Sequence, residues 1–273
     1  MTDLRSFPNG PIRFESAMER VHRTLSDFNG ILQSKRLSPG FAGKLYGRMQ
    51  WASATCFGRF GRAMLRAFSR RQHEPGRTNL NPQIIAACEF WLRNLASVRP
   101  REVPVNPERL PLAVSYSDGE GESAGVGIAL WLPSGEVLGG YVRVPEVMRR
   151  MWSQRASLES VRDIFQIEAV GPLLVLYNWG HRIRDHLWIH FIDNEGALAA
   201  LAKGSSSVLS GEVIVGCTHE LAARFGVIGW FDRVDTHSNP VDKLSRGRLQ
   251  GPWRFVRIRF PPELIAQLAK SFG

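Results

Sequence analysis

The chain lacks the features that mark secreted, disulfide-rich or membrane-spanning proteins. Among its 273 residues there are only three cysteines, Cys56, Cys88 and Cys217. Their spacing fits neither a metal-binding pattern nor a disulfide framework, which favours an intracellular protein, in the cytoplasm or the nucleus. The sequence shows no secretory signal and no apolar run long enough to cross a bilayer, so we expect no membrane partner.

Positive charge is what the chain has in excess. Its 35 basic and 25 acidic residues give a formal net charge of +10, and the isoelectric point is about 10.2. This balance suits a polyanionic partner such as nucleic acid. With 44% hydrophobic residues, a chain of this length has room for one full domain and a smaller helical one.

Residues 106–250 alternate between strand and helix patterns. An apolar run at 110–118 closes in Asp-Gly, which is typical of a buried strand that ends in a turn. Two further runs complete an antiparallel meander, a helical pattern follows, and a nearly continuous apolar run predicts a central parallel strand. After the first run, the expected elements are strands at 124–131 and 136–144, a helix at 158–179, a strand at 187–193, helices at 194–203 and 207–225, a strand at 227–234, and a helix that opens with Pro240.

Four carboxylates have distinctive places in these elements. Asp118 and Asp193 end strand patterns, Glu168 lies beside the core-facing stripe of the helix pattern, and Asp242 follows Asn-Pro-Val. Ligand sites in open α/β sheets lie at the carboxyl ends of strands, so Asp118 and Asp193 could meet there. A carboxylate beside a core is costly to desolvate unless it binds a cation, and hard oxygen ligands suit Mg²⁺ or Mn²⁺.

Three of the four carboxylates also have a structural explanation without a ligand. The Asp118-Gly119 pair is commonly a simple turn, Asp193-Asn194 could cap the next helix, and Asp242 could be an early-helix acid that interacts with the dipole. His190, on the same strand as Asp193, is expected to be a sheet histidine, not a ligand.

The order Asp, Glu, Asp, Asp on strand, helix, strand and helix resembles the ribonuclease H superfamily. It looks most like the ribonuclease H domain of reverse-transcribing elements, the retrotransposons. The resemblance implies an α/β, ribonuclease H-like fold over 106–250, with a mixed five-stranded sheet flanked by helices. It also implies an endonuclease that hydrolyses the RNA strand of RNA–DNA hybrids with two Mg²⁺ or Mn²⁺ ions.

The resemblance assigns roles residue by residue. All four carboxylates would be metal ligands and catalytic residues. Asp118 would bridge the two metals, Glu168 and Asp193 would hold the ion on the leaving-group side, and Asp242 would help to position the attacking water. His237 lies in the loop where many family members keep a mobile histidine, although its spacing to Asp242 is shorter than in the bacterial enzymes. Expected nucleic-acid contacts near this site are Asn194 and Asn239.

Residues 1–105 predict a separate helical, basic region. Apolar side chains recur at helical spacing over 45–71, and arginines and a lysine form a stripe on another side. Such a stripe could contact phosphates, but it could equally be a solvated helix face. Its members are Lys44, Arg48, Arg59, Arg62, Arg66 and Arg70. Residues 44–52 resemble the connecting region that follows the polymerase in retrotransposon polyproteins.

One absence limits the biological interpretation. No adjacent Asp-Asp pair occurs, so the polymerase motif of a reverse transcriptase is missing, and such a polymerase domain would be a partner outside this chain. The chain could be part or remnant of an element. Two alternatives stay open: a catalytically inactive nucleic-acid-binding remnant, or an integrase-like or exonuclease-like member of the superfamily. Residues 251–273 predict a strand and helix that extend the core.

Overall fold

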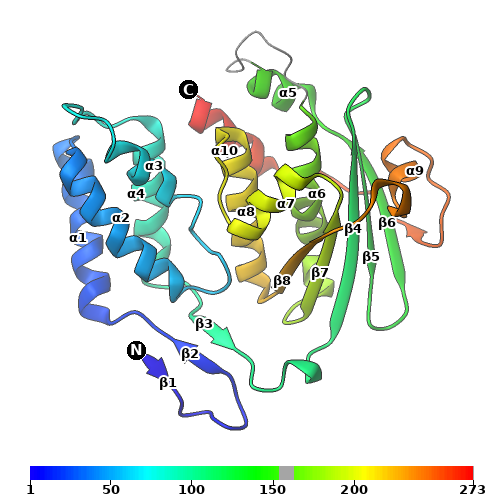
Figure 1. The fold of residues 1–273 in the computed structure, drawn as a ribbon, viewed down its shortest axis with the longest axis horizontal. Coiled ribbons are helices and arrows are strands. Elements are labelled where there is room, and N and C mark those ends of the chain that lie inside the picture. The colour runs from blue at the N-terminus through cyan, green and yellow to red at the C-terminus, as the bar shows by residue number, and fades with distance from the viewer. Residues whose placement is uncertain (154–162, 273) are drawn as a thin grey trace. The chain divides into compact units, whose positions relative to one another are not determined.

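The computed structural model describes residues 1–153 and 163–272. The chain divides into two compact units, Met1–Pro107 together with Lys270–Gly273, and Glu108–Ala269 (Figure 1). Within the described residues, no helix combines the length and the apolarity that a bilayer crossing demands.

The first unit contains four helices and a small antiparallel sheet in the order β1-β2-β3. The helix α1 packs on α4, and α2 packs on α3. Aromatic rings fill the core between them, with Phe28 stacked on Phe68 at 5.9 Å between centroids. The elements are β1 (Thr2–Asp3), β2 (Ile12–Phe14), α1 (Met18–Ser34), α2 (Pro39–Ala54), α3 (Leu65–Arg71), α4 (Pro82–Asn94) and β3 (Arg101–Val103).

The single helical pattern expected over 45–71 is wrong, because the chain forms two helices separated by a turn. Gly61 in this turn has a φ of +72°, a left-handed conformation that a non-glycine residue rarely adopts. A Cβ at Gly61 would lie 2.3 Å from the ring of Trp91, so the chain turns directly against α4. The apolar periodicity continued across the break because both helices bury residues in the same core.

The second unit is an α/β domain. A one-turn helix, Pro107–Arg109, leads into it, and two more such turns, Gly180–Arg182 and Thr236–Ser238, follow α6 and β8. Its elements are β4 (Leu112–Glu120), β5 (Gly125–Trp131), β6 (Val137–Arg143), α5 (Glu146–Ser153), α6 (Ile164–Trp179), β7 (Leu187–Ile192), α7 (Glu195–Lys203), α8 (Leu209–Phe225), β8 (Ile228–Arg233), α9 (Asp242–Ser245), β9 (Arg254–Phe255) and α10 (Pro262–Phe272).

The mixed sheet has six strands in the order β8-β7-β4-β5-β6-β9. The strands β4, β5 and β6 form the expected antiparallel meander, while β7 runs parallel to both β4 and β8. The sixth strand corrects the expectation of five. Arg254 and Phe255 pair in parallel with Leu138 and Gly139, so residues after 250 complete the edge of the sheet.

Helices cover the two faces of this sheet differently. The helix α6 packs against β4 and β5, with α8 beside it, as Figure 1 shows. On the other face, Tyr116 packs against a buried cluster that includes Val241 and Leu244 at the start of α9. Because side chains alternate along a strand, the side chain of Ser117 faces α6 and that of Asp118 faces α9. Gly119 lies on the α6 side, where a side chain would meet that helix.

Two helix boundaries differ from expectation. The helix predicted over 158–179 is described only from Ile164, since residues 154–162 lie outside the described part of the chain. The helix predicted to open at Pro240 is a single turn that begins at Asp242, and Pro240 lies in the preceding turn. The ring of Pro240 fixes φ near −65°, which fits this turn as readily as it fits the first position of a helix.

Candidate metal centre

The register of two neighbouring strands brings Asp118 and Asp193 to one place. Tyr116 of β4 pairs with Phe191 of β7 in parallel, and their rings stack at 4.9 Å between centroids. Asp118 and Asp193 each lie two residues further along, one near the end of β4 and the other just after β7. Side-chain alternation therefore places both carboxylates on the same face of the sheet and at the same end. The expected strand end at Asp118 is wrong, because β4 continues through Gly119 to Glu120 and stays paired with β5.

Glu168 reaches this place from α6, and Gly119 makes room for it. A Cβ at position 119 would lie 3.1 Å from Cδ of Glu168 and 2.8 Å from Cγ2 of Ile167. The backbone N–H of Gly119 also donates a hydrogen bond to the Glu168 carboxylate. Pro172 lies inside α6 and has no N–H to offer to the carbonyl of Glu168 four residues earlier.

Asp118, Glu168 and Asp193 together form a group that could hold a metal ion. One carboxylate oxygen from each lies within 4.8 Å of the others. Asp118 is 5% exposed, Glu168 is 4% exposed, and Asp193 is half-buried. Oε2 of Glu168 is buried and has no hydrogen-bond partner among the described residues. Three facing carboxylates with an unsatisfied buried oxygen fit a divalent cation well, because such a cation would neutralise their mutual repulsion.

The electrostatics of the group show the same repulsion. Burial, together with the charges of Asp193 and Asp118, raises the pKa of Glu168 well above its usual range. Burial, with smaller contributions from the negative charges of Asp193 and Asp242, also raises the pKa of Asp118 to about 6. Without a cation, Glu168 and Asp118 therefore hold their protons to a higher pH than isolated carboxylates do.

Asp242 is near the group but is not a member of it. Its charge raises the pKa of Asp118, and it forms an ion pair with Arg246 at 3.0 Å. The hydroxyl of Ser245 donates to the carbonyl of Asp242 at 2.7 Å. The same side chain lies close enough to Asp118 to lower the pKa of that carboxyl. The positive charge of Arg246, directly after α9, also lowers the pKa of Asp118. A negative and a positive charge therefore lie beside the group on this side.

His190 belongs to a buried polar chain behind the group. Trp188 Nε1 donates to Ser115 Oγ at 2.7 Å, and Ser115 Oγ lies 2.7 Å from Nδ1 of His190. Nε2 of His190 lies 3.0 Å from Ser117 Oγ. Burial lowers the pKa of His190 to about 3, so the ring is neutral. The geometry agrees with the expectation of a sheet histidine that is not a ligand.

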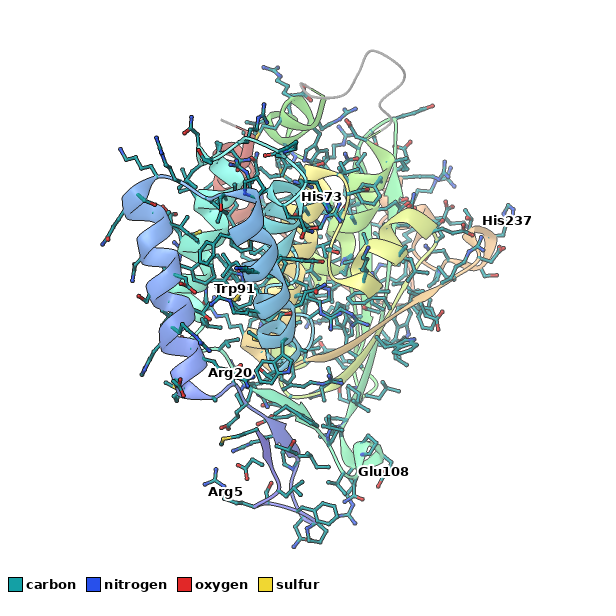
Figure 2. All side chains as sticks on the ribbon, turned by 60° about the vertical axis from the view of Figure 1, so that its left-hand side comes forward. Arg5, Arg20, His73, Trp91, Glu108 and His237 are labelled. Carbon is teal, nitrogen blue, oxygen red and sulfur yellow. The ribbon has the colours of Figure 1, made fainter. Side chains whose placement is uncertain are left out.

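The three other residues predicted near the site differ in their burial and hydrogen bonding. Asn194 caps α7 by accepting from the N–H of Ala197 at 2.9 Å. Asn239 is buried and donates to the carbonyl of Ser117, so its side chain holds the structure together and does not face solvent. His237 is exposed at the tip of the loop after β8 (Figure 2). The predicted contacts of these three residues with nucleic acid or product stay predictions.

The predicted basic stripe does not lie along one helix. Lys44 and Arg48 are on α2, Arg66 and Arg70 are on α3, and Arg59 and Arg62 are in the connection between the helices. Lys44 is exposed, but the other five are half-buried. Arg48 is paired with Asp27 at 2.6 Å, and burial together with the charge of Arg62 lowers the pKa of Arg59.

Ser245 and Arg246 are site neighbours that sequence reasoning missed. Arg246 is four residues after Asp242, a spacing that places both side chains on one side of a helical turn and could have predicted the ion pair. No such signal exists for the contact of Ser245 with Asp118, because it joins elements more than a hundred residues apart. No protein-family model matches the chain, and no curated protein matches it either.

Proposed function

We propose that the second unit is a metal-dependent endonuclease of the ribonuclease H type, which hydrolyses the RNA strand of RNA–DNA hybrids. The observation that supports it most directly is the convergence of Asp118, Glu168 and Asp193 from β4, α6 and the end of β7 within 4.8 Å. Apart from the added helix α5 and the edge strand β9, the strands and helices along this unit follow the order expected from the sequence. The basic balance of the chain is compatible with a nucleic-acid substrate.

The donor set determines which ions fit. All three carboxylates are hard oxygen ligands, and no cysteine or imidazole belongs to the group. This favours Mg²⁺ or Mn²⁺, two ions in the mechanism that we propose. Divalent ions held there would activate a water molecule and stabilise the negative charge that develops on the leaving oxygen.

The protein side chains would bind the metal, position the attacking water and contact the substrate phosphate. Asp118, Glu168 and Asp193 would hold the metal, and the buried position of Glu168 would fix its carboxylate in one orientation. Asp242, which is partly exposed and paired with Arg246, would contact the attacking water from the side of α9. Arg246 is 58% exposed, so its guanidinium is available to a substrate phosphate in addition to Asp242.

The second candidate is a nucleic-acid-binding remnant that no longer cleaves. It is favoured by the pairing of Asp242 with Arg246, which could withhold this carboxylate from catalysis. An integrase-like or exonuclease-like nuclease would use the same acidic group and would differ in the substrate that it prefers. Substrate choice therefore separates these candidates better than the site geometry does.

The deciding experiment offers the whole chain a hybrid labelled on its RNA strand, with Mg²⁺, with Mn²⁺ or with a chelator. Single-stranded RNA, duplex RNA and duplex DNA are tested in parallel. We expect internal cleavage of the hybrid RNA only, and a loss of more than about a hundredfold in Asp193→Asn. The matched control is Asp232→Asn, an exposed aspartate on β8 outside the group, which should retain full activity.

Three results would contradict parts of the proposal. Hybrid binding without cleavage in either metal would favour the remnant. Preference for strand ends or for duplex DNA would favour the exonuclease-like or integrase-like alternative. Calorimetric titration with Mn²⁺ tests the site itself, since Asp193→Asn should lose binding and Asp242→Asn should retain most of it. Equal binding by Asp193→Asn and the Asp232→Asn control would refute the metal assignment.

A further inference from the structure

The first unit contains a groove between α1 and α2 that has no part in the acidic group. Its volume is about 370 Å³, and residues from both helices line it, together with Ser16 before α1 and Leu95 after α4. Ligand pockets commonly have volumes of about 300–1,000 Å³, so this groove is large enough for one small ligand or one unit of a polymer.

The charged residues that line the groove are all arginines, namely Arg20, Arg23 and Arg48. Arg20 and Arg23 are exposed, whereas Arg48 is paired with Asp27 of α1 at 2.6 Å. The pairing fixes the guanidinium of Arg48 and leaves the other two arginines to determine the charge of the groove. An anion is therefore the ligand that the groove would attract.

Trp51 supplies a flat apolar surface among these charges. It lines the groove, and it is 45% exposed although it is a large aromatic residue. The guanidinium of Arg20 lies over the indole at 4.8 Å from the ring centroid, which holds the ring in one orientation. Figure 2 shows Arg20 near the start of α1, where this helix faces the end of α2.

We propose that this groove binds a nucleotide unit, with its base stacked on Trp51 and its phosphate contacted by Arg20 and Arg23. Exposed aromatic rings beside arginines are the combination that binds single-stranded nucleic acid, because every base has a face that can stack and every nucleotide has a phosphate. An anionic membrane would also attract arginines, but it requires apolar groups that project outward, and Trp51 lines a concavity.

The groove revises which basic residues contact nucleic acid in this unit. The stripe expected from sequence is largely half-buried, whereas Arg20 and Arg23 are exposed beside an aromatic surface. The nucleotide could come from a single strand or from a free nucleotide, and the two share the same chemistry. Neither source requires the acidic group to be catalytic, so this inference and the proposed nuclease activity can fail independently.

The test uses the whole chain carrying Asp193→Asn in the presence of a chelator, so that no cleavage occurs. Binding of a fluorescent oligo(U) is measured by anisotropy over a range of salt concentrations, with uridine monophosphate as competitor. Trp51→Ala should weaken binding on the order of tenfold, and Trp51→Phe should restore most of it. Arg23→Ala should reduce the slope of log affinity against log salt by about 0.7.

Arg93→Ala is the matched control, since Arg93 is a 66% exposed arginine on α4 of the same unit. Effective competition by the monophosphate at the affinity of the oligonucleotide would identify a free nucleotide as the ligand, and weak competition would identify a single strand. The inference is overturned if Trp51→Ala and Arg23→Ala bind as tightly as Arg93→Ala. It is equally overturned if the two variants lose binding to phosphatidylserine vesicles but bind oligo(U) normally.

Discussion

The side-chain amide of Asn239 donates a hydrogen bond of 3.0 Å to the carbonyl oxygen of Ser117, the residue before Asp118. The carbonyl oxygen of the same side chain accepts from the N–H of Val241 at 3.3 Å. Asn239 thus fastens the turn before α9 to the end of β4, across 122 positions of the chain. This link brings Asp242 near enough to Asp118 for its charge to raise the pKa of that carboxyl.

Replacing Asn239 by alanine should therefore both destabilise the fold and disturb the site. The side chain is 6% exposed, so its removal leaves the Ser117 carbonyl without this donor, at a cost of about 1–3 kcal/mol. Urea unfolding measures the loss. The control is Asn79→Ala, because Asn79 is exposed and accepts from Arg71 through its backbone carbonyl. Equal stability of the two variants would show that the link contributes nothing.

Local patterns predicted the elements of this site well. Apolar runs that close near an aspartate identified both strands, although β4 continues past Asp118 to Glu120, and helical periodicity placed Glu168 beside the core. Such patterns can be recognised in a sequence because each depends only on residues that are close together along the chain. The antiparallel meander and the parallel strand β7 appear in the structure as the patterns indicated.

Contacts between distant segments were not predictable in the same way. The pairing of Tyr116 with Phe191 sets the register that unites Asp118 with Asp193, and no local pattern specifies it. The turn at Gly61 was missed because apolar spacing continued across it. The strand expected within 251–273 is only the two residues of β9, and a strand this short has too few residues to show alternation.

The absence of a side chain at Gly119 should be essential for the position of Glu168. In Gly119→Ala, the new methyl group would crowd Ile167 and the Glu168 carboxyl at 2.8 and 3.1 Å. We expect a loss of about 1–3 kcal/mol in the free energy of unfolding and a weaker affinity for Mn²⁺. Chemical unfolding and calorimetric titration measure the two effects.

A second glycine provides the control for that substitution. Gly30 lies in α1, and a Cβ there would meet nothing within 4 Å. Gly30→Ala should therefore stabilise the chain by about 0.5–1 kcal/mol, because alanine restricts the unfolded backbone more than glycine does. If Gly119→Ala behaved like Gly30→Ala, the proposed close approach of α6 to β4 would be incorrect.

Glu168→Gln should stabilise the protein when no divalent metal is present. The raised pKa of Glu168 means that the folded state holds a proton that the unfolded state releases. Stability should therefore fall as pH rises above the ordinary glutamate pKa of about 4.5, and the amide should remove this part of the fall. Thermal unfolding with a chelator at neutral and alkaline pH measures the difference.

Added Mg²⁺ should reverse this difference in stability, so that the wild type becomes more stable than Glu168→Gln. The ion would stabilise the wild type through three carboxylates but would find one ligand fewer in Glu168→Gln. Glu195→Gln serves as the control, because Glu195 is 73% exposed and pairs with Arg233 on the surface. A Glu168→Gln variant that is less stable than the wild type with the chelator, or that gains equally from Mg²⁺, would contradict the metal assignment.

His190 should produce a pH dependence of the opposite sign. Its pKa is lowered from 6.5 to about 3 by burial, so between these values the unfolded state binds a proton that the folded state does not. Stability contributed by the neutral ring is present above about pH 6.5 and is lost as pH falls, by about 2 kcal/mol between pH 7 and pH 5. His190→Gln retains a polar side chain between Ser115 and Ser117 but cannot titrate. The fall in unfolding free energy between pH 7 and pH 5 should therefore be smaller in His190→Gln by about that amount. If unfolding free energy fell in parallel with pH in the two proteins, the His190 ring would be protonated in the folded state or reached by water.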